Sequence, residues 1–246
     1  MMQHLPYGEL KWVDDLSNPD FYVVPDDNHT GYILEIDAEI PVELHDKFRE
    51  LPLCAERMAA PNSKHKKLLT TLYDKKHYVI HYRSLIQARK LGLIVIKIHR
   101  ALKFSQSAWM KPYIYNFLCS SAFGKTMENP RKRTEVKLVK SLDGRYGVEA
   151  QIASPDFHSL SIISEDFVIV QKKQTKVVID KPLYIGMSIL DISKTLTYDF
   201  HYDKIKTWLG SKAELLYMDT DSFIYSFRGL EIYELMKQNS VIFDTS

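Results

Sequence analysis

The stretch LLYMDTDSFIYSF at residues 215–227 decides the expected fold of this chain. Short apolar runs at its two ends flank the polar string MDTDS at residues 218–222. Apolar runs on both sides of a turn-forming string predict a β-hairpin, with two carboxylates at its tip. Because Asp219 and Asp221 are two residues apart, their side chains point to the same side of an extended backbone.

Two carboxylates held at a tight turn suit a hard divalent cation. Mg²⁺ binds carboxylate oxygens and usually keeps substrate phosphates as further ligands. The alternative is that MDTDS merely forms a turn, because Asp and Ser favour turn positions. For a bare Asp-x-Asp pair the turn is the more common interpretation, so sequence outside the hairpin must decide.

The rest of the sequence predicts a mixture of helices and strands. The longest helix candidate is 184–209, which ends near Gly210, a plausible C-terminal cap. One face of it carries Ile185, Ile189, Ile192, Leu196 and Phe200. Further helices are predicted at 83–91 and 105–125, and strands at 31–40, 77–82, 93–98, 166–171 and 175–180, the last two as a pair.

Composition excludes several classes of protein. Of 246 residues, 45% are hydrophobic and 26% are charged, which is typical of a globular chain. The longest apolar run, Leu93–Ile96, is far too short for a membrane span, and no secretory signal opens the sequence. Two cysteines, Cys54 and Cys119, are too few for a disulfide framework and indicate a reducing compartment. A membrane protein and a secreted disulfide scaffold are therefore excluded, and the lack of a repeat period in the sequence excludes a solenoid.

Charge is divided unevenly along the chain. Residues 1–60 carry 13 acids and 4 bases, whereas residues 61–150 carry 5 acids and 19 bases. Between Lys64 and Lys103 there are 11 basic side chains and a single acid, Asp74. This asymmetry predicts a face that binds a polyanion, and a solvated basic surface without a partner is an equally good interpretation.

Two weaker groups of residues have structural explanations. His77 and His81 are four apart, but the strand-like residues between them favour structural histidines over a zinc site. Glu35, Asp37 and Glu39 share one face of a predicted strand and could bind a cation. A solvated strand edge is the preferred interpretation for these three acids.

LLYMDTDSFIY at residues 215–225 resembles motif C of the family B DNA polymerases, which reads Tyr-x-Asp-Thr-Asp-Ser. Further segments are similar to the polymerases of Polinton or Maverick transposons, in the protein-primed branch that includes viral and organellar-type enzymes. These segments are KPLYIGMSILDISKTLTYDFHYDKIK at 181–206, SSAFGKTMENPRKRTEVKLV at 120–139, HRALKFSQSAWMKPYI at 99–114 and GYILEIDAEIPVELHD at 31–46. The resemblance covers nearly the whole chain.

The resemblance implies a template-directed DNA polymerase, a nucleotidyltransferase that uses two Mg²⁺ (or Mn²⁺) ions. Its implied partners are a DNA template and primer, a dNTP and a terminal protein that serves as primer. Asp221 is then expected to bind metal directly, and Asp219 to be the second catalytic and metal-binding acid. Tyr217, Thr220 and Ser222 are expected beside the primer or the nucleotide.

Motif B of the family, Lys-x-x-x-Asn-Ser-x-Tyr-Gly, is matched only at its end. Ser120 stands at the Asn position, and Phe123 replaces Tyr. The resemblance implies that Ser121, Phe123 and Gly124 line the pocket of the nascent base pair. It further implies that the DNA backbone is followed by Lys125, Arg131, Lys132 and Arg133, for which a solvated basic loop is the alternative.

Two departures from the family bear on activity. In the family, a segment similar to residues 1–13 directly follows motif A. We therefore expect motif A and the exonuclease domain before it to be absent from these 246 residues. Asn116 stands where motif B has its lysine, as if a stretch had been lost. The family thumb would follow Ser246. We therefore expect a polymerase fragment that is inactive alone, with a catalytically dead nucleic-acid-binding remnant as the alternative.

The fold class that the resemblance implies is α+β, a partial polymerase palm with an antiparallel sheet and the motif C hairpin, plus truncated fingers. Its expected parts are a palm and insertion region at 1–110, fingers with the motif B remnant at 111–133, a strand-rich insertion at 134–181, and the palm helix and hairpin at 182–246. No membrane is expected as a partner. An intracellular location is expected, nuclear if the chain derives from a transposon.

Overall fold

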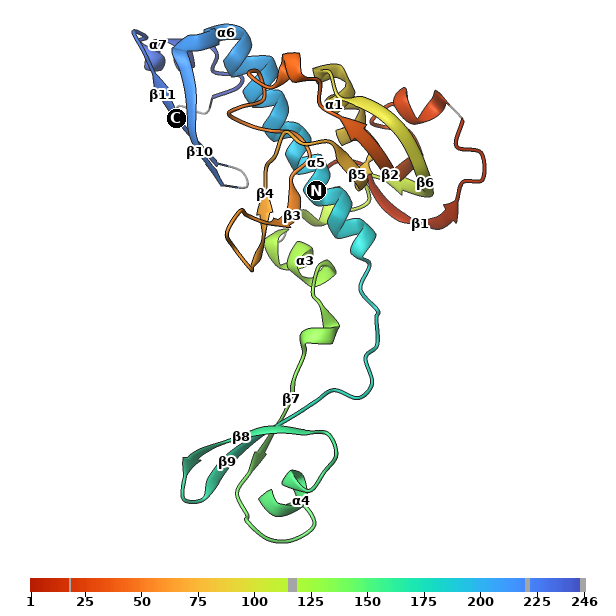
Figure 1. Ribbon diagram of the computed structural model, residues 1–246, viewed down its shortest axis with the longest axis vertical. Helices are drawn as coiled ribbons and strands as arrows, with labels where there is room; N and C mark the ends of the chain where they lie inside the picture. Colours follow the sequence, from red (N-terminus) through yellow and green to blue (C-terminus); the bar gives the residue numbers. More distant parts are fainter. Residues whose placement is uncertain (18, 115–118, 220–221, 244–246) are drawn as a thin grey trace. The chain divides into compact units, whose positions relative to one another are not determined.

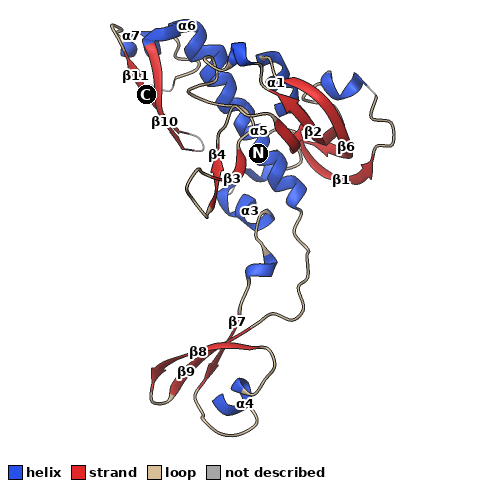
Figure 2. Ribbon diagram, in the orientation of Figure 1, coloured by secondary structure: helices blue, strands red, loops and turns tan. Residues whose placement is uncertain are grey.

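The structure is a computed structural model that describes residues 1–17, 19–114, 119–219 and 222–243. The chain forms two compact units, the first made of Met1–Cys119 with Tyr184–Ser246 and the second of Ser120–Leu183. Helices and antiparallel sheets occur in both units (Figure 2). The predicted α+β class is therefore confirmed.

The first unit is built on a curled antiparallel sheet in the order β1-β6-β2-β5 (Figure 1). Its strands are β1 (Leu5–Trp12), β2 (Thr30–Glu39), β5 (Lys75–His81) and β6 (Ile94–Ser107). Strand β2 alternates as predicted, because Leu34, Ile36 and Ala38 are buried in the core. Glu35 and Asp37 therefore lie on the opposite face. Since β2 is flanked by β5 and β6, the predicted strand edge is wrong.

Helix α1 (Tyr82–Leu91) covers the core face of this sheet, and it confirms the helix predicted at 83–91. Leu85 and Ala88 are buried against the strands. The helix ends at Gly92, whose φ of 116° lies in the left-handed region that favours glycine. The hydrophobic residues on one face of the helix thus close the first core.

Helix α5 (Leu183–Tyr198) continues without a break into a π-helical segment, η4 (Asp199–Lys206), and a last turn, α6 (Thr207–Leu209). Together they confirm the long helix predicted at 184–209, which ends at Gly210. Leu196 is exposed, however, so its place on the predicted apolar face is wrong. Past this position the buried side chains of the helix are His201, Tyr202, Ile205 and Leu209.

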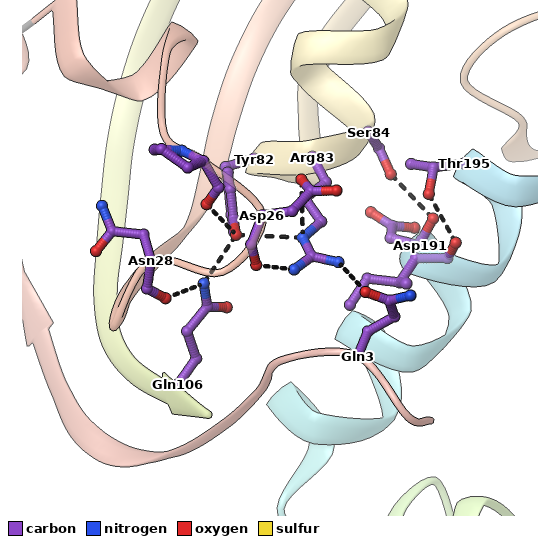
Figure 3. Close-up of polar contacts among 11 residues, drawn as sticks. Gln3, Asp26, Asn28, Tyr82, Arg83, Ser84, Gln106, Asp191 and Thr195 are labelled. Atoms are coloured by element: carbon purple, nitrogen blue, oxygen red, sulfur yellow. Dashed lines mark hydrogen bonds and ion pairs between the residues drawn. The ribbon is translucent and has the colours of Figure 1, made fainter. Parts of the chain in front are cut away.

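Buried polar contacts join α5 to α1 (Figure 3). The Asp191 carboxylate accepts the backbone N–H of His81, at 2.9 Å, just before α1 begins. The Ser84 hydroxyl donates to the Asp191 carbonyl at 3.1 Å. Arg83, also buried, donates to the Tyr82 hydroxyl and to the carbonyl of Asp26. These bonds satisfy polar groups that would otherwise be costly to bury.

Smaller elements complete the first unit. They are two hairpins, β3 (Glu56–Ala59) with β4 (Lys66–Leu69) and β10 (Ala213–Asp219) with β11 (Ser222–Phe227), the helices α2 (Lys111–Ile114) and α7 (Ile232–Gln238), and the 3-10 turns η1 (Pro19–Tyr22), η2 (Val42–Leu44) and η5 (Gly210–Lys212). Among the helices of the described residues, none combines the length and the apolar character needed to cross a bilayer.

The second unit holds a three-stranded antiparallel sheet in the order β7-β9-β8. Its elements are β7 (Glu135–Val139), β8 (Phe157–Ser164), β9 (Phe167–Lys172), the helix α4 (Val148–Ile152) and the 3-10 turn η3 (Pro130–Lys132). Its small core is Val139, Val148, Val168 and Val170. Helix α3 (Cys119–Thr126) lies at the boundary of the two units in the sequence.

Two predicted elements differ from the structure. Residues 175–180 form no strand, because β9 pairs with β7 and β8, which flank it on both sides. The helix predicted at 105–125 is wrong in its first part, since β6 extends to Ser107 and pairs with β1. Tertiary pairing thus outweighs local helical propensity in that segment.

Candidate functional site

The hairpin predicted around MDTDS is confirmed as the antiparallel strands β10 and β11 in the first unit (Figure 1). Asp219 ends β10 and pairs with Ser222, which begins β11. Both residues are exposed. Thr220 and Asp221 lie outside the described residues. The structure therefore places Asp219 at the end of the hairpin and leaves the metal-ligand prediction for Asp221 untested.

The two faces of the hairpin differ in burial. Phe223 stacks on Phe200 of η4, with ring centroids 5.7 Å apart, so this face packs on the helix. A register shift after Leu215 pairs Tyr217 with Ile224, and these side chains are 57% and 56% exposed. Since Tyr217 lies two residues before Asp219, an aromatic ring and a carboxylate share the open face. A ligand can reach both groups there.

His201 of η4 contacts the face of the hairpin that packs on the helix. Its ring is completely buried, and Nδ1 lies 2.8 Å from the hydroxyl of Tyr225 on β11. Burial lowers the pKa of His201 to about 4, because the charged imidazolium would lose its hydration. The imidazole is therefore neutral at pH 7, and it couples the hairpin to the helix by a hydrogen bond.

Glu50 anchors the base of the hairpin. Its carboxylate accepts the backbone N–H of Leu215 at 2.9 Å and a hydrogen bond from Lys206 Nζ at 2.6 Å. Lys206 in turn donates to the carbonyl of Ala213 at 2.8 Å. Burial alone would raise the pKa of Glu50, but the bonds from Lys206 and Leu215 hold it below its ordinary value. The ionised carboxylate thus fixes β10 against η4.

We expect Glu50→Ala to lower the free energy of unfolding by about 1–3 kcal/mol, because the amide of Leu215 and the ammonium of Lys206 lose their acceptor. Urea denaturation of both proteins measures the difference. Glu43→Ala, which removes an exposed carboxylate a few residues upstream, is the matched control and should change the value by less than about 0.5 kcal/mol. Equal stability of the Glu50→Ala variant and the wild type would contradict the anchoring role.

The predicted base-pair pocket residues lie on α3, in the second unit. The Phe123 side chain is half-buried and Gly124 is exposed. A Cβ added at Gly124 would meet nothing within 4 Å, so packing in this structure does not require glycine. The Ser121 side chain lies outside what the structure describes. The pocket role of these residues stays a prediction.

The predicted backbone-binding residues meet a carboxylate of the same chain. Glu128 forms ion pairs with Lys125 at 3.1 Å and with Arg133 at 2.7 Å. Hydrogen bonds from Arg133 and Lys125 lower the pKa of Glu128 to about 2. Arg131 is exposed, and the Lys132 side chain is not described. Two of the four expected phosphate contacts therefore have a competing anion beside them.

The structure thus brings Tyr217, Asp219 and Ser222 together near the tip of the β10–β11 hairpin, in the first unit. The candidate residues of α3 and of the loop after it belong to the second unit. The hairpin residues and the α3 residues are therefore described as two separate groups.

A further cluster was missed by the sequence analysis, which paired His77 with His81. His81 is completely buried beside Phe104, whereas the His77 ring stacks on His99, with centroids 4.1 Å apart. Asp37 lies beside both rings. No spacing in the sequence indicates this contact, because the three residues come from three strands.

No protein-family model, curated protein or solved structure matches this chain.

Proposed function

We propose that this chain is part of a template-directed DNA polymerase of family B and that the hairpin of β10 and β11 belongs to its active site. One observation carries the proposal. The string Tyr217–Ser222, which resembles motif C, falls across the end of β10 and the start of β11, with Tyr217 and Asp219 on the open face.

The donor set of the hairpin end fits a hard cation. Asp219 supplies an exposed carboxylate, and Asp221 supplies a second one two residues later in the sequence. When bound there, Mg²⁺ would activate the primer hydroxyl and stabilise the leaving pyrophosphate during nucleotidyl transfer. Asp221 would bind the ion directly with Asp219 as the second acid, and the ring of Tyr217 would contact the primer end. The family's further carboxylate, in motif A, would come from a segment outside these 246 residues.

The second candidate function is nucleic-acid binding without catalysis. It is favoured by the surplus of 14 positive charges in residues 61–150. Both functions predict DNA affinity that falls steeply with salt, because bound counterions are released when lysine and arginine neutralise phosphates. Only the polymerase predicts template-dependent incorporation of dNTPs.

The test is primer extension by this chain joined to segments that supply motif A, the motif B lysine and the thumb, with a labelled primer on a template, dNTPs and Mg²⁺ or Mn²⁺. We expect incorporation that obeys the template. We expect Asp219→Asn to lower the rate by about 10²–10³, the usual cost of losing one preorganised electrostatic contact.

Glu214→Gln is the matched control for this experiment. Glu214 lies at the opposite end of the same hairpin, paired with Arg228 at 2.9 Å, so its removal changes the charge equally without touching the tip. The rate should stay within about twofold of the parent. DNA binding without incorporation would favour the binding remnant, and incorporation that survives Asp219→Asn would refute the role of this residue.

A further inference from the structure

We infer that Asp37, His77 and His99 form a binding site for a divalent transition-metal ion of the Zn²⁺ class. The three residues lie on adjacent strands, with β2 between β5 and β6. Each offers a ligand atom within 4.8 Å of those of the other two. The inference does not depend on the proposed polymerase function.

A register irregularity between β2 and β6 turns His99 toward this position. Glu35 pairs with Arg100, but the next residue of β2, Ile36, pairs with Ile98, so His99 is an extra residue on β6. Such β-bulges re-aim a side chain, and they are common next to functional sites. The side chain of His99 thereby joins the acidic face of β2.

A second irregularity lies on the other side of β2. Asp37 faces two residues of β5, Lys76 and His77, where regular pairing would give one. The backbone N–H of His77 donates to Asp37 Oδ1 at 2.8 Å. His77 has a φ of 52°, a region that non-glycine residues rarely adopt and that is over-represented at ligand sites. Two bulges thus place a histidine on each side of one carboxylate.

Glu35 sets the orientation of the His77 ring. Its Oε1 lies 2.8 Å from His77 Nδ1, and Arg100 Nε donates to Oε2 at 2.6 Å. A carboxylate that accepts the Nδ1 proton leaves Nε2 with a free lone pair, which is the usual arrangement of a histidine that binds metal. Arg100 holds the Glu35 carboxylate in place for this role.

His99 brings a second ring nitrogen to the same carboxylate. Its Nε2 is buried and lies 2.9 Å from Asp37 Oδ2. Two ligand atoms about 2.0 Å from a tetrahedral ion are about 3.3 Å apart, so His99 Nε2 and Asp37 Oδ2 must separate slightly, and ligand atoms nearer the 4.8 Å limit must approach each other. The His77 side chain, 64% exposed, has room to tilt from its stacked position.

The donor set selects the class of ion. Neutral imidazole suits Zn²⁺, Cu²⁺ and Ni²⁺, whereas Mg²⁺ prefers oxygen ligands alone. Two nitrogens and one carboxylate oxygen leave a fourth position of Zn²⁺ for water. Because the ligands come from three strands, a bound ion would join β5, β2 and β6.

The test uses the full chain, stripped with a chelator and titrated with Zn²⁺ by calorimetry. We expect one ion per chain and, at 100 times the Kd, a Tm higher by about 5–10 °C. The His77→Ala and His99→Ala substitutions should each weaken binding at least tenfold. Glu35→Gln keeps every ligand and should weaken binding by about 10–100-fold. Mg²⁺ should give no shift.

His65→Ala is the matched control, because it removes an exposed histidine of the same unit outside the cluster. Asp219→Asn should leave Zn²⁺ binding unchanged, which separates this site from the hairpin. Circular dichroism of the metal-free variants checks that they fold. Zn²⁺ affinity that survives His77→Ala with His99→Ala would overturn the inference, as would unchanged affinity in a folded Glu35→Gln variant.

Discussion

Lowering the pH from 7.5 to 5.0 is expected to remove about 4 kcal/mol from the free energy of unfolding, owing to His81 and His201. Both rings are completely buried. Burial lowers the pKa of His81 to about 3, and the charge of Arg83 adds to the effect. Burial lowers the pKa of His201 to about 4.

The direction follows from proton binding. Below the ordinary histidine pKa of about 6.5, His81 and His201 are protonated in the unfolded chain but stay neutral in the folded chain. The two buried histidines therefore lower the free energy of unfolding very little above about pH 6.5. Below that pH the free energy of unfolding falls as the pH drops toward their folded pKa values. Carboxylates with lowered folded pKa values, such as Glu50, begin to contribute only near their own unfolded values, close to pH 4. Urea denaturation between pH 7.5 and 5.0 isolates the histidines.

His81→Leu separates the two contributions. Within the described residues, neither ring nitrogen of His81 meets a hydrogen-bond partner, so an apolar side chain of similar size removes an unsatisfied polar group. We expect this variant to be at least as stable as the wild type at pH 7.5 and to lose only about 2 kcal/mol by pH 5.0. An undiminished loss in this variant would show that His81 does not titrate as described.

Local sequence patterns predict those strands and helices of this fold whose apolar periodicity is visible within their own residues. The hairpin at 215–227, the helix at 83–91 and the alternation of β2 are all visible as apolar periodicity. Partner choice is less local. The sheet of the second unit pairs β9 with β7 and β8, and no pattern in residues 166–171 distinguishes these partners from 175–180.

The cluster of Asp37, His77 and His99 shows why part of a site escapes prediction. His77 and His99 meet Asp37 only because β5 and β6 each carry a register irregularity at that level. A bulge changes which residues face each other across two strands. The residues around His77 and His99 show no sequence pattern that predicts a bulge at either position. The motif C string, by contrast, is continuous in sequence, so its position at a strand end could be predicted.

The basic stretch from Lys64 to Lys103 shows the same limit for charge. Its 11 basic side chains predict one exposed face, but Lys75 and Arg83 are buried, and Arg100 is paired with Glu35 at 2.5 Å. Charge counts along a sequence do not distinguish a solvated lysine from one that is satisfied inside the protein. A change at buried Lys75 or its partners is expected to alter the free energy of unfolding more than a change at a solvated lysine.

Glu56→Ala is expected to lower the free energy of unfolding by about 3–5 kcal/mol, because it leaves the Lys75 ammonium buried without its counter-ion. The Lys75 side chain is 0% exposed. Its Nζ donates to Glu56 Oε2 at 2.9 Å, to the Thr71 carbonyl at 3.0 Å and to the Thr71 hydroxyl at 2.9 Å. All three donors of the ammonium are therefore used, and one acceptor supplies the compensating charge.

A double-mutant cycle tests whether the cost comes from the stranded charge. Lys75→Met removes the ammonium and keeps an unbranched apolar side chain in the core, so Lys75→Met with Glu56→Ala should be at least about 2 kcal/mol more stable than Glu56→Ala alone. Lys76→Met, at the exposed neighbouring position, is the control and should change stability by less than about 0.5 kcal/mol. If the double variant is as unstable as the sum of both single variants, Glu56 stabilises the fold by packing, and the charge of Lys75 is tolerated without it.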